Sequence, residues 1–184
     1  VILGYVCTPG HEQDLELIAP AIRRVLERHG GKVRFRAYGA IAPSLRGVEW
    51  VEFEKGLIPD YRKFARHLRK SGITIGLAPL IKHPFNECKS PIKFLEYAAS
   101  RIVGVYSNSK AYRDIVRHGV TGFLVDNDPD LWEATIEDII NNPDLRAYVA
   151  SEAFREVSQH WTLRNAAHRW LDVYRKVALE SQSQ

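Results

Sequence analysis

Residues 73–99 of the chain read ITIGLAPLIKHPFNECKSPIKFLEYAA, and this stretch decides the fold. Its apolar beginning, 73–80, is typical of a buried strand. Ser90 and Pro91 are typical of a helix start, because a serine hydroxyl can cap the first turn and proline needs no N–H there. A strand therefore leads through a polar loop into a predicted helix over 90–99. The amino end of a helix can hold an anion, and phosphate is the obvious ligand for this junction.

Strand-like runs and helical patterns alternate along the rest of the chain. Strands are predicted over 1–7, 33–38, 48–53, 102–106 and 121–125, and helices over 14–29, 61–70, 110–118, 131–141, 143–160 and 162–179. This alternation predicts an α/β fold: one Rossmann-like, doubly wound parallel sheet of about six strands with helices on both faces, plus two C-terminal helices. Such a sheet binds ligands beyond the carboxyl ends of its strands, at the topological switch point. We expect the loops 7–14, 54–60, 79–90 and 106–112 to surround a ligand.

The bulk composition suits one compact domain with a short extension. The chain has 184 residues with 45% hydrophobic content, which predicts a domain over 1–160 and a helix with a frayed tail over 161–184. It contains no methionine and begins inside an apparent strand, so we expect a domain cut from a longer protein. The net charge of +4 fits an anionic ligand without requiring nucleic acid.

Several classes of protein are disfavoured by what the sequence lacks. There is no apolar run of about 18 residues and no signal peptide pattern, so no membrane-spanning helix is predicted. Cys7 and Cys88 lie far apart and predict neither a disulfide framework nor a metal site, which favours a reducing, cytoplasmic location. Four histidines have no acidic partners at the spacing of metal ligands, so they do not predict a metal site either: His83, His118, His160 and His168.

Charged residues stand at spacings of four and three around the helix over 90–99: Lys89 just before it, and Lys93 and Glu96 within it. This spacing places them on one side, with the opposite side facing the core through Ile92, Leu95 and Ala99. One interpretation is an ordinary surface ion pair. The other gives Lys89 and the N–H groups after Ser90 to a diphosphate, while Glu96 accepts hydrogen bonds from sugar hydroxyls.

Two further segments carry open alternatives. In the turn over 4–14, Gly10 would allow a ligand close to the backbone, and His11 is either a phosphate contact or a solvent-exposed bystander. This turn lacks the G-x-G-x-x-G fingerprint, which disfavours NAD. The basic helix over 61–70 would either rest on an anionic membrane or present a solvated outer face, and the second interpretation is favoured.

In this order and spacing, the segments resemble the C-terminal, nucleotide-sugar-binding domain of GT-B glycosyltransferases of the family-4-like "group 1" branch. The resemblance covers nearly the whole chain and is carried by the Gly4 turn, 76–80, KSPIKFLEYAA at 89–99, GVTGFLV at 119–125 and NPDLR at 142–146. It implies a retaining transfer of sugar from a UDP-, GDP- or dTDP-sugar to a glycan or lipid-linked acceptor, as in polysaccharide biosynthesis, without a metal or other cofactor.

The resemblance also implies roles for individual residues. Glu96 matches the second of two family glutamates and would bind the ribose, with Leu57 and Leu80 beside the nucleoside. Cys88 stands where the first glutamate contacts the donor sugar, and Glu87 is one residue out of register. Glu87 and Lys89 are then the predicted catalytic residues. The predicted contacts of the donor diphosphate and sugar are Gly10, His11, Lys89, Ser90, Pro91 and Lys93.

The family's first turn usually carries an arginine and a lysine for the diphosphate. Tyr5 and His11 stand near those places here, so Lys89 or Lys82 would supply the missing charge. The acceptor half, normally the preceding domain, is not in this chain. We therefore expect the chain to bind nucleotide with little or no transfer. A peripheral contact of the parent enzyme with the inner face of a membrane is a separate expectation.

Two rival functions remain open. The departures at Tyr5, His11 and Cys88 fit a non-catalytic Rossmann-like module that docks a partner through an apolar face of the last helix, near Trp161, Trp170 and Tyr174. A different doubly wound enzyme, such as an epimerase, would need an acid/base pair, for which His11 and Glu87 are the nearest residues.

Overall fold

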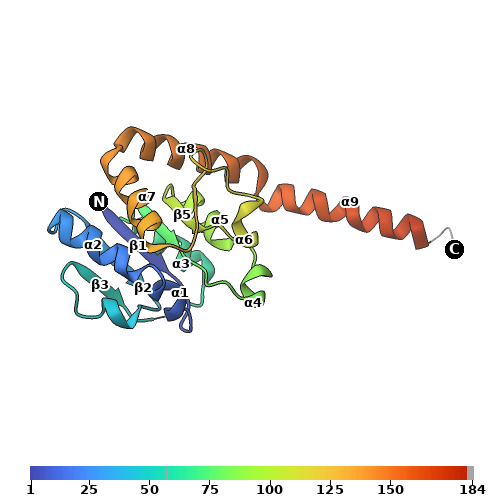
Figure 1. Ribbon diagram of the computed structural model, residues 1–184. Helices are drawn as coiled ribbons and strands as arrows, with labels where there is room; N and C mark the ends of the chain where they lie inside the picture. Colours follow the sequence, from blue (N-terminus) through green and yellow to red (C-terminus); the bar gives the residue numbers. More distant parts are fainter. Residues whose placement is uncertain (57, 182–184) are drawn as a thin grey trace.

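A computed structural model of the chain describes residues 1–56 and 58–181, and a parallel β-sheet forms its centre (Figure 1). Within the described residues the sheet has six strands in the order β3-β2-β1-β4-β5-β6, and every neighbouring pair is parallel. The strands are β1 (Ile2–Val6), β2 (Arg34–Tyr38), β3 (Val51–Glu54), β4 (Ile75–Ala78), β5 (Val103–Ser107) and β6 (Phe123–Val125). The predicted doubly wound α/β fold is confirmed.

Helices cover both faces of the sheet. They are α1 (Glu12–Glu16), α2 (Ala19–His29), α3 (Tyr61–Lys70), α4 (Pro84–Glu87), α5 (Ile92–Ala99), α6 (Lys110–Arg113), α7 (Pro129–Asn141), α8 (Pro143–His160) and α9 (Leu163–Ser181), with a 3₁₀ turn at Pro43–Leu45. Helices α2 and α7 pack in the core on one face, and α3, α5 and α6 pack in the core on the other. Helix α8 contributes Val149 to the first core and Ala153 to the second.

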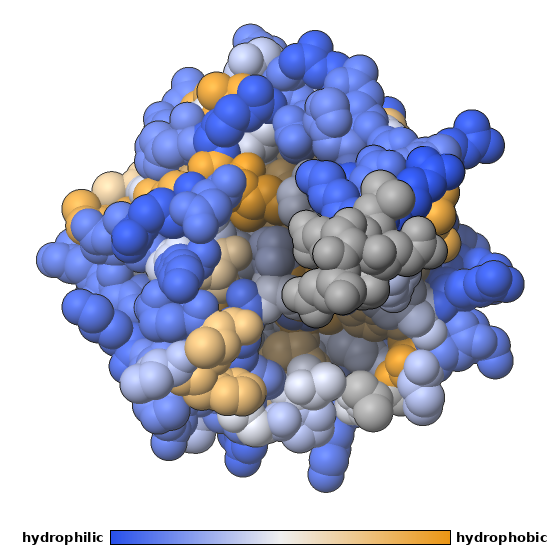
Figure 2. Space-filling view, turned by 90° about the vertical axis from the view of Figure 1, so that its right-hand side faces the viewer, coloured by the Kyte–Doolittle hydropathy of each residue, from blue (hydrophilic) through white to orange (hydrophobic). Residues whose placement is uncertain are grey.

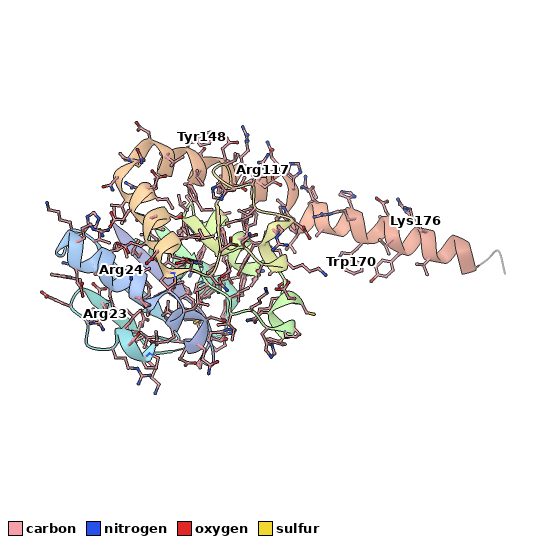
Figure 3. The ribbon with its side chains drawn as sticks, viewed as in Figure 1. Arg23, Arg24, Arg117, Tyr148, Trp170 and Lys176 are labelled. Atoms are coloured by element: carbon pink, nitrogen blue, oxygen red, sulfur yellow. The ribbon has the colours of Figure 1, made fainter. Side chains whose placement is uncertain are left out.

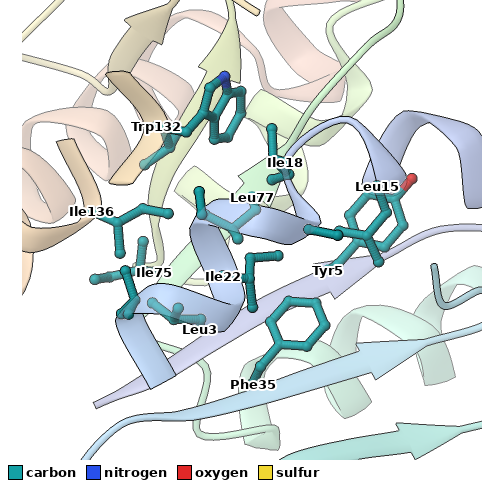
Figure 4. Packing of buried hydrophobic residues seen from close by; sticks show 14 of the residues in the cluster. Leu3, Tyr5, Leu15, Ile18, Ile22, Phe35, Ile75, Leu77, Trp132 and Ile136 are labelled. Carbon is teal, nitrogen blue, oxygen red and sulfur yellow. The ribbon is translucent and has the colours of Figure 1, made fainter. Parts of the chain in front are cut away.

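The two cores follow from the alternation of side chains along each strand. Leu3 of β1 and Leu77 of β4 face the first core, where they pack near Ile22 of α2 and Trp132 of α7 (Figure 4). Val6 of β1 and Ala78 of β4 face the opposite way and belong to the second core. Because both faces are covered, the central strands carry apolar residues on both sides, which is why they read as continuous apolar runs.

The helix predicted over 14–29 is wrong in its extent, because the chain forms two helices there. Helix α1 ends at Glu16 and α2 begins at Ala19. Pro20 explains the break, since it has no N–H to donate to the Glu16 carbonyl and its ring crowds the preceding turn. Gly30 ends α2 in the left-handed conformation, with φ of 50°.

The helix predicted over 90–99 begins later than expected. Its first residue is Ile92, its cap position is Pro91, and no side chain caps the first turn, so the expected cap from Ser90 is wrong. Helix α4, which was not predicted, occupies part of the loop before it. Pro84 begins α4, and the His83 Nδ1 accepts the Phe85 N–H at 3.2 Å.

Helix α5 also turns a different side to the core. The buried apolar residues are Phe94, Tyr97 and Ala98, whereas Ile92 is 41% exposed. Two aromatic rings bury more apolar surface than the set expected from the sequence, which was Ile92, Leu95 and Ala99.

The helix predicted over 110–118 is shorter and ends at Arg113. The Thr121 hydroxyl accepts the Arg117 N–H at 2.9 Å, and the Thr121 N–H donates to the Arg117 carbonyl at 2.8 Å. These two bonds close a turn where the helix was expected.

Helix α9 projects away from the rest of the molecule (Figure 1). Trp170 and Lys176 leave it on opposite sides (Figure 3). Its exposed apolar side chains include Leu163, Trp170 and Tyr174, which are 90%, 60% and 65% exposed. None of the described helices combines the length and the apolar character needed to cross a membrane.

Candidate functional site

A cavity of about 350 Å³ opens at the carboxyl ends of β1 and β4. These two strands are neighbours in the middle of the sheet, and the strand order reverses direction between them. This is the topological switch point, where doubly wound folds bind their ligands. The walls come from the loop after β1, the end of β4, the loop before α5, and helices α5 and α6. Figure 2 views this side of the molecule, where the surface is hollowed among polar and apolar residues.

Asp14 of α1 forms one wall of the cavity and is only 5% exposed. Its carboxylate lies 2.9 Å from His11 Nδ1 and accepts the backbone N–H of Ile81 at 2.8 Å. The Lys89 ammonium lies 3.8 Å from the same carboxylate. Burial alone would raise the pKa of Asp14, but these donors and the Lys89 charge outweigh burial and lower it. Because the carboxylate is ionised at neutral pH, His11 Nδ1 is the donor of their hydrogen bond.

The loop after β1 is held by a buried tyrosine. The Tyr5 hydroxyl donates to the His11 carbonyl at 2.9 Å, and burial raises the pKa of Tyr5 far above its ordinary value. Burial also raises the pKa of the neighbouring Cys7 thiol to about 11, so both groups are neutral at physiological pH. An uncharged side chain therefore fixes the loop after β1.

The end of β4 is held by a closed set of hydrogen bonds. The Ser107 hydroxyl accepts the Leu80 N–H at 2.8 Å and donates to the Asn127 side-chain oxygen at 2.7 Å. The Asn127 amide in turn donates to the Leu80 carbonyl at 2.7 Å. Since every group in this set has a partner, the strand end that lines the cavity is firmly placed.

Helix α5 points its amino end at the cavity. Its first backbone bond runs from the Leu95 N–H to the Pro91 carbonyl, so the N–H groups before Leu95 precede the helical bonding pattern. The Lys93 ammonium lies 2.7 Å from the Glu96 carboxylate, which is 9% exposed. The Lys89 ammonium also lies 5.4 Å from the centre of the Phe85 ring. This end of the cavity therefore combines two lysines with a helix amino end, an arrangement suited to an anion.

A smaller hollow of about 170 Å³ adjoins the main cavity. The two share Cys7, Thr8, Lys93 and Glu96, so the Glu96 carboxylate lies where they meet. Aromatic rings contribute to the walls of the smaller hollow, namely those of Tyr38, Tyr61 and Phe64. Flat apolar walls next to a carboxylate can receive a ring and the hydroxyl groups attached to it.

The structure gathers most of the predicted site residues around the main cavity. Its described lining includes His11, Leu80, Lys89, Ser90, Lys93 and Glu96. Gly10 and Pro91 lie next to lining residues in the sequence, and Glu87 is two residues from Lys89, but none of the three is among the described residues of the lining. Lys82 is exposed and is also not among them. Leu57 lies outside the described residues.

Sequence reasoning missed several residues of the site. The sequence pattern assigns no role to Asp14, Thr8 or Tyr112, although all three line the cavity. An acidic residue among the apolar residues that face the core was the available signal for Asp14. Among residues 1–56 and 58–181, no three His, Cys, Asp or Glu side chains form a group that could hold a metal ion.

Several solved structures share this fold. The C-terminal domain of LpcC, a group 1 glycosyl transferase family protein of Francisella tularensis, is 17% identical with a TM-score of 0.66, over 88% of this chain and 86% of that one. Sucrose-phosphate synthase of Thermosynechococcus elongatus is 16% identical with a TM-score of 0.77, over 97% of this chain and 46% of that one. Anabaena HepE, in complex with UDP-glucose, is 14% identical with a TM-score of 0.70, over 100% and 49%. At these identities the likeness shows the fold.

The chain spans about half the length of the two larger proteins. No curated protein matches it. The family model described as "Glycosyl transferases group 1" matches residues 1–142, which is more than half of the chain. This chain belongs to the group 1 glycosyl transferases.

Proposed function

We propose that this chain is the nucleotide-sugar-binding part of a retaining glycosyltransferase that moves a sugar from a nucleoside diphosphate to a glycan or lipid-linked acceptor. The observation that carries the proposal is the cavity at the β1/β4 switch point, where the amino end of α5, Lys89 and Glu96 meet. HepE, which shares the fold, was crystallised with UDP-glucose, and that supports a nucleotide sugar as the ligand here.

The walls of the cavity suggest how such a donor would lie. The diphosphate would take the helix amino end and Lys89, because both favour negative charge. The ribose hydroxyls would donate to Glu96, and the base would enter the smaller hollow beside Tyr61 and Phe64. Transfer leaves a nucleoside diphosphate with growing negative charge, which Lys89 would stabilise as the sugar departs. Glu87 of the adjacent α4 is our proposed counterpart of the family's first glutamate.

We propose that the acceptor half corresponds to the part of the longer solved structures that this chain does not cover. Residues 1–160 would then bind the donor, and 161–184 would form a terminal helix. The exposed apolar residues of α9, among them Trp170 and Tyr174, would lie against that other half. Without the acceptor half we expect donor binding with little or no transfer.

Calorimetric titration with UDP, GDP and dTDP tests the proposal. We expect at least one of the three to bind, because the diphosphate and ribose contacts are common to all and only the base differs. Circular dichroism in the same buffer shows that the protein is folded. A folded protein that binds none of the three would overturn the proposal and favour a non-catalytic interaction module.

Although the sequence pattern of helix α3 favours a solvated outer face, this helix is the place we propose for a peripheral membrane contact of the parent protein. Five of its cations are exposed, and none forms an ion pair with another described residue: Arg62, Lys63, Arg66, Arg69 and Lys70. We expect sedimentation with phosphatidylglycerol-rich vesicles and not with phosphatidylcholine vesicles. Replacing Arg62, Arg66 and Arg69 by glutamine should weaken binding to the anionic vesicles about fivefold per charge removed. Equal sedimentation of the parent and the triple variant would contradict the contact.

A further inference from the structure

We propose that Asp14 is a positioning residue that assembles the phosphate-binding wall of the cavity. This inference rests on the proposed function. Asp14 is the residue at which three separate parts of the wall meet: the loop after β1, the loop after β4, and the segment that joins α4 to α5. Its role is to hold those parts in a shape that fits a diphosphate.

Both carboxylate oxygens of Asp14 have polar partners, and most of these partners come from distant parts of the chain. Oδ1 accepts the Ile81 N–H at 2.8 Å and lies 3.5 Å from the Asn86 side-chain nitrogen. Oδ2 lies 2.9 Å from His11 Nδ1 and 3.8 Å from the Lys89 ammonium. Asn86, itself 5% exposed, also donates to the Ile81 carbonyl at 2.9 Å. Asp14 and Asn86 thus form one buried connection between the β1 and β4 loops.

This connection is what places Lys89. The Lys89 side chain lies between the Asp14 carboxylate and the Phe85 ring, and Phe85 belongs to α4, which also carries Asn86. A lysine side chain has considerable rotamer freedom, which a ligand would otherwise have to restrict on binding. Holding the ammonium at the cavity wall before the ligand arrives lowers that cost.

The charge of Asp14 makes the inference testable by its sign. A carboxylate in the wall repels a bound diphosphate, so removing the charge would raise diphosphate affinity if electrostatic repulsion were its whole effect. If Asp14 positions the wall, removing the charge loosens Lys89 and His11 and lowers the affinity instead. The direction of the change therefore separates positioning from charge alone.

Asp14→Asn keeps the size of the side chain and removes the charge. We expect its affinity for the preferred nucleoside diphosphate to fall about tenfold, while its affinity for the matching nucleoside changes less than twofold. A merely structural role would weaken both ligands alike. Glu16→Gln is the matched control, because Glu16 lies on the same helix and accepts the Ser44 N–H at 3.3 Å, away from the cavity. It should bind both ligands like the parent protein.

Asn86→Ala is the second variant, for the case that Asp14→Asn does not fold. Asn86 is not among the described lining residues, so a selective loss of diphosphate affinity would have to act through the loops. In Lys89→Ala, the further change Asp14→Asn should cost little, because the two act together. Unchanged or increased diphosphate affinity in a folded Asp14→Asn or Asn86→Ala protein would overturn the inference. If the parent protein binds no nucleotide, it is the proposed function that fails.

Discussion

Gly39→Ala is expected to lower the free energy of unfolding by about 3 kcal/mol, since backbone strain and overpacking each cost about 1–3 kcal/mol. Gly39 follows β2 with φ of +86°, a conformation that residues with a Cβ rarely adopt. A Cβ at this position would lie 1.8 Å from the carbonyl oxygen of Cys7, at the end of β1. The Cys7 backbone would have to move, and Cys7 lines the cavity. Urea denaturation measures the loss of stability, and titration with the preferred nucleotide should show weaker binding.

Gly47→Ala is the control that separates the two costs. Gly47 has a similar φ of +73°, but a Cβ there meets no atom within 4 Å. Only the backbone cost applies, so we expect a loss of about 1 kcal/mol and unchanged nucleotide affinity. Equal losses of stability in the two variants would show that the contact with Cys7 is relieved without a significant cost.

Lys89→Ala is expected to weaken nucleoside diphosphate binding by roughly 10- to 100-fold, the range for a lost hydrogen bond to a charged group. Lys89 is one of the two lysines that line the cavity beside the amino end of α5. It is also close to Asp14, so its removal leaves a buried carboxylate with one cation fewer, which adds to the loss. Calorimetry with the diphosphate and the matching nucleoside measures the effect, and the nucleoside affinity should change little.

Lys82→Ala provides the matched control for this variant. Both lysines were possible sources of the charge that the first turn lacks, but Lys82 is exposed and Lys89 is only partly so. We expect Lys82→Ala to bind the diphosphate within about twofold of the parent, as an exposed charge contributes little. A larger loss in Lys82→Ala than in Lys89→Ala would show that the diphosphate site lies elsewhere on the loop.

The sheet could be predicted because its signals are local. Short apolar runs separated by helical patterns are enough to indicate parallel strands, and β4 and β5 read clearly for this reason. The element boundaries depended on finer interactions. The break before α2 comes from one missing N–H at Pro20, and the far end of the helix expected over 110–118 is replaced by the turn that Thr121 closes with Arg117. Such boundaries can be predicted from a sequence only when the hydrogen-bond acceptor of each backbone N–H group is worked out.

The site was predictable where α5 and the residues just before it carry it. Helical spacing places Lys93 and Glu96 together, and Lys89 precedes the helix by only three residues. Asp14 was out of reach, because its partners Ile81 and Lys89 come from the other side of the switch point, far along the chain. The core-facing side of α5 was also predicted wrongly, since the packing of Tyr97 depends on neighbouring elements. The Tyr97 hydroxyl, for example, donates to the Leu77 carbonyl of β4 at 2.9 Å.

A co-crystal structure with the preferred nucleotide would show whether a nucleoside diphosphate binds at the β1/β4 switch point. We expect diphosphate oxygens within hydrogen-bonding distance of Lys89 and of the first N–H groups of α5. We also expect ribose hydroxyls on the Glu96 carboxylate and the base beside Tyr61 and Phe64. A nucleotide bound outside this cavity, or bound in it with the ribose at Lys89 and the phosphates at Glu96, would show that the donor site is assigned wrongly.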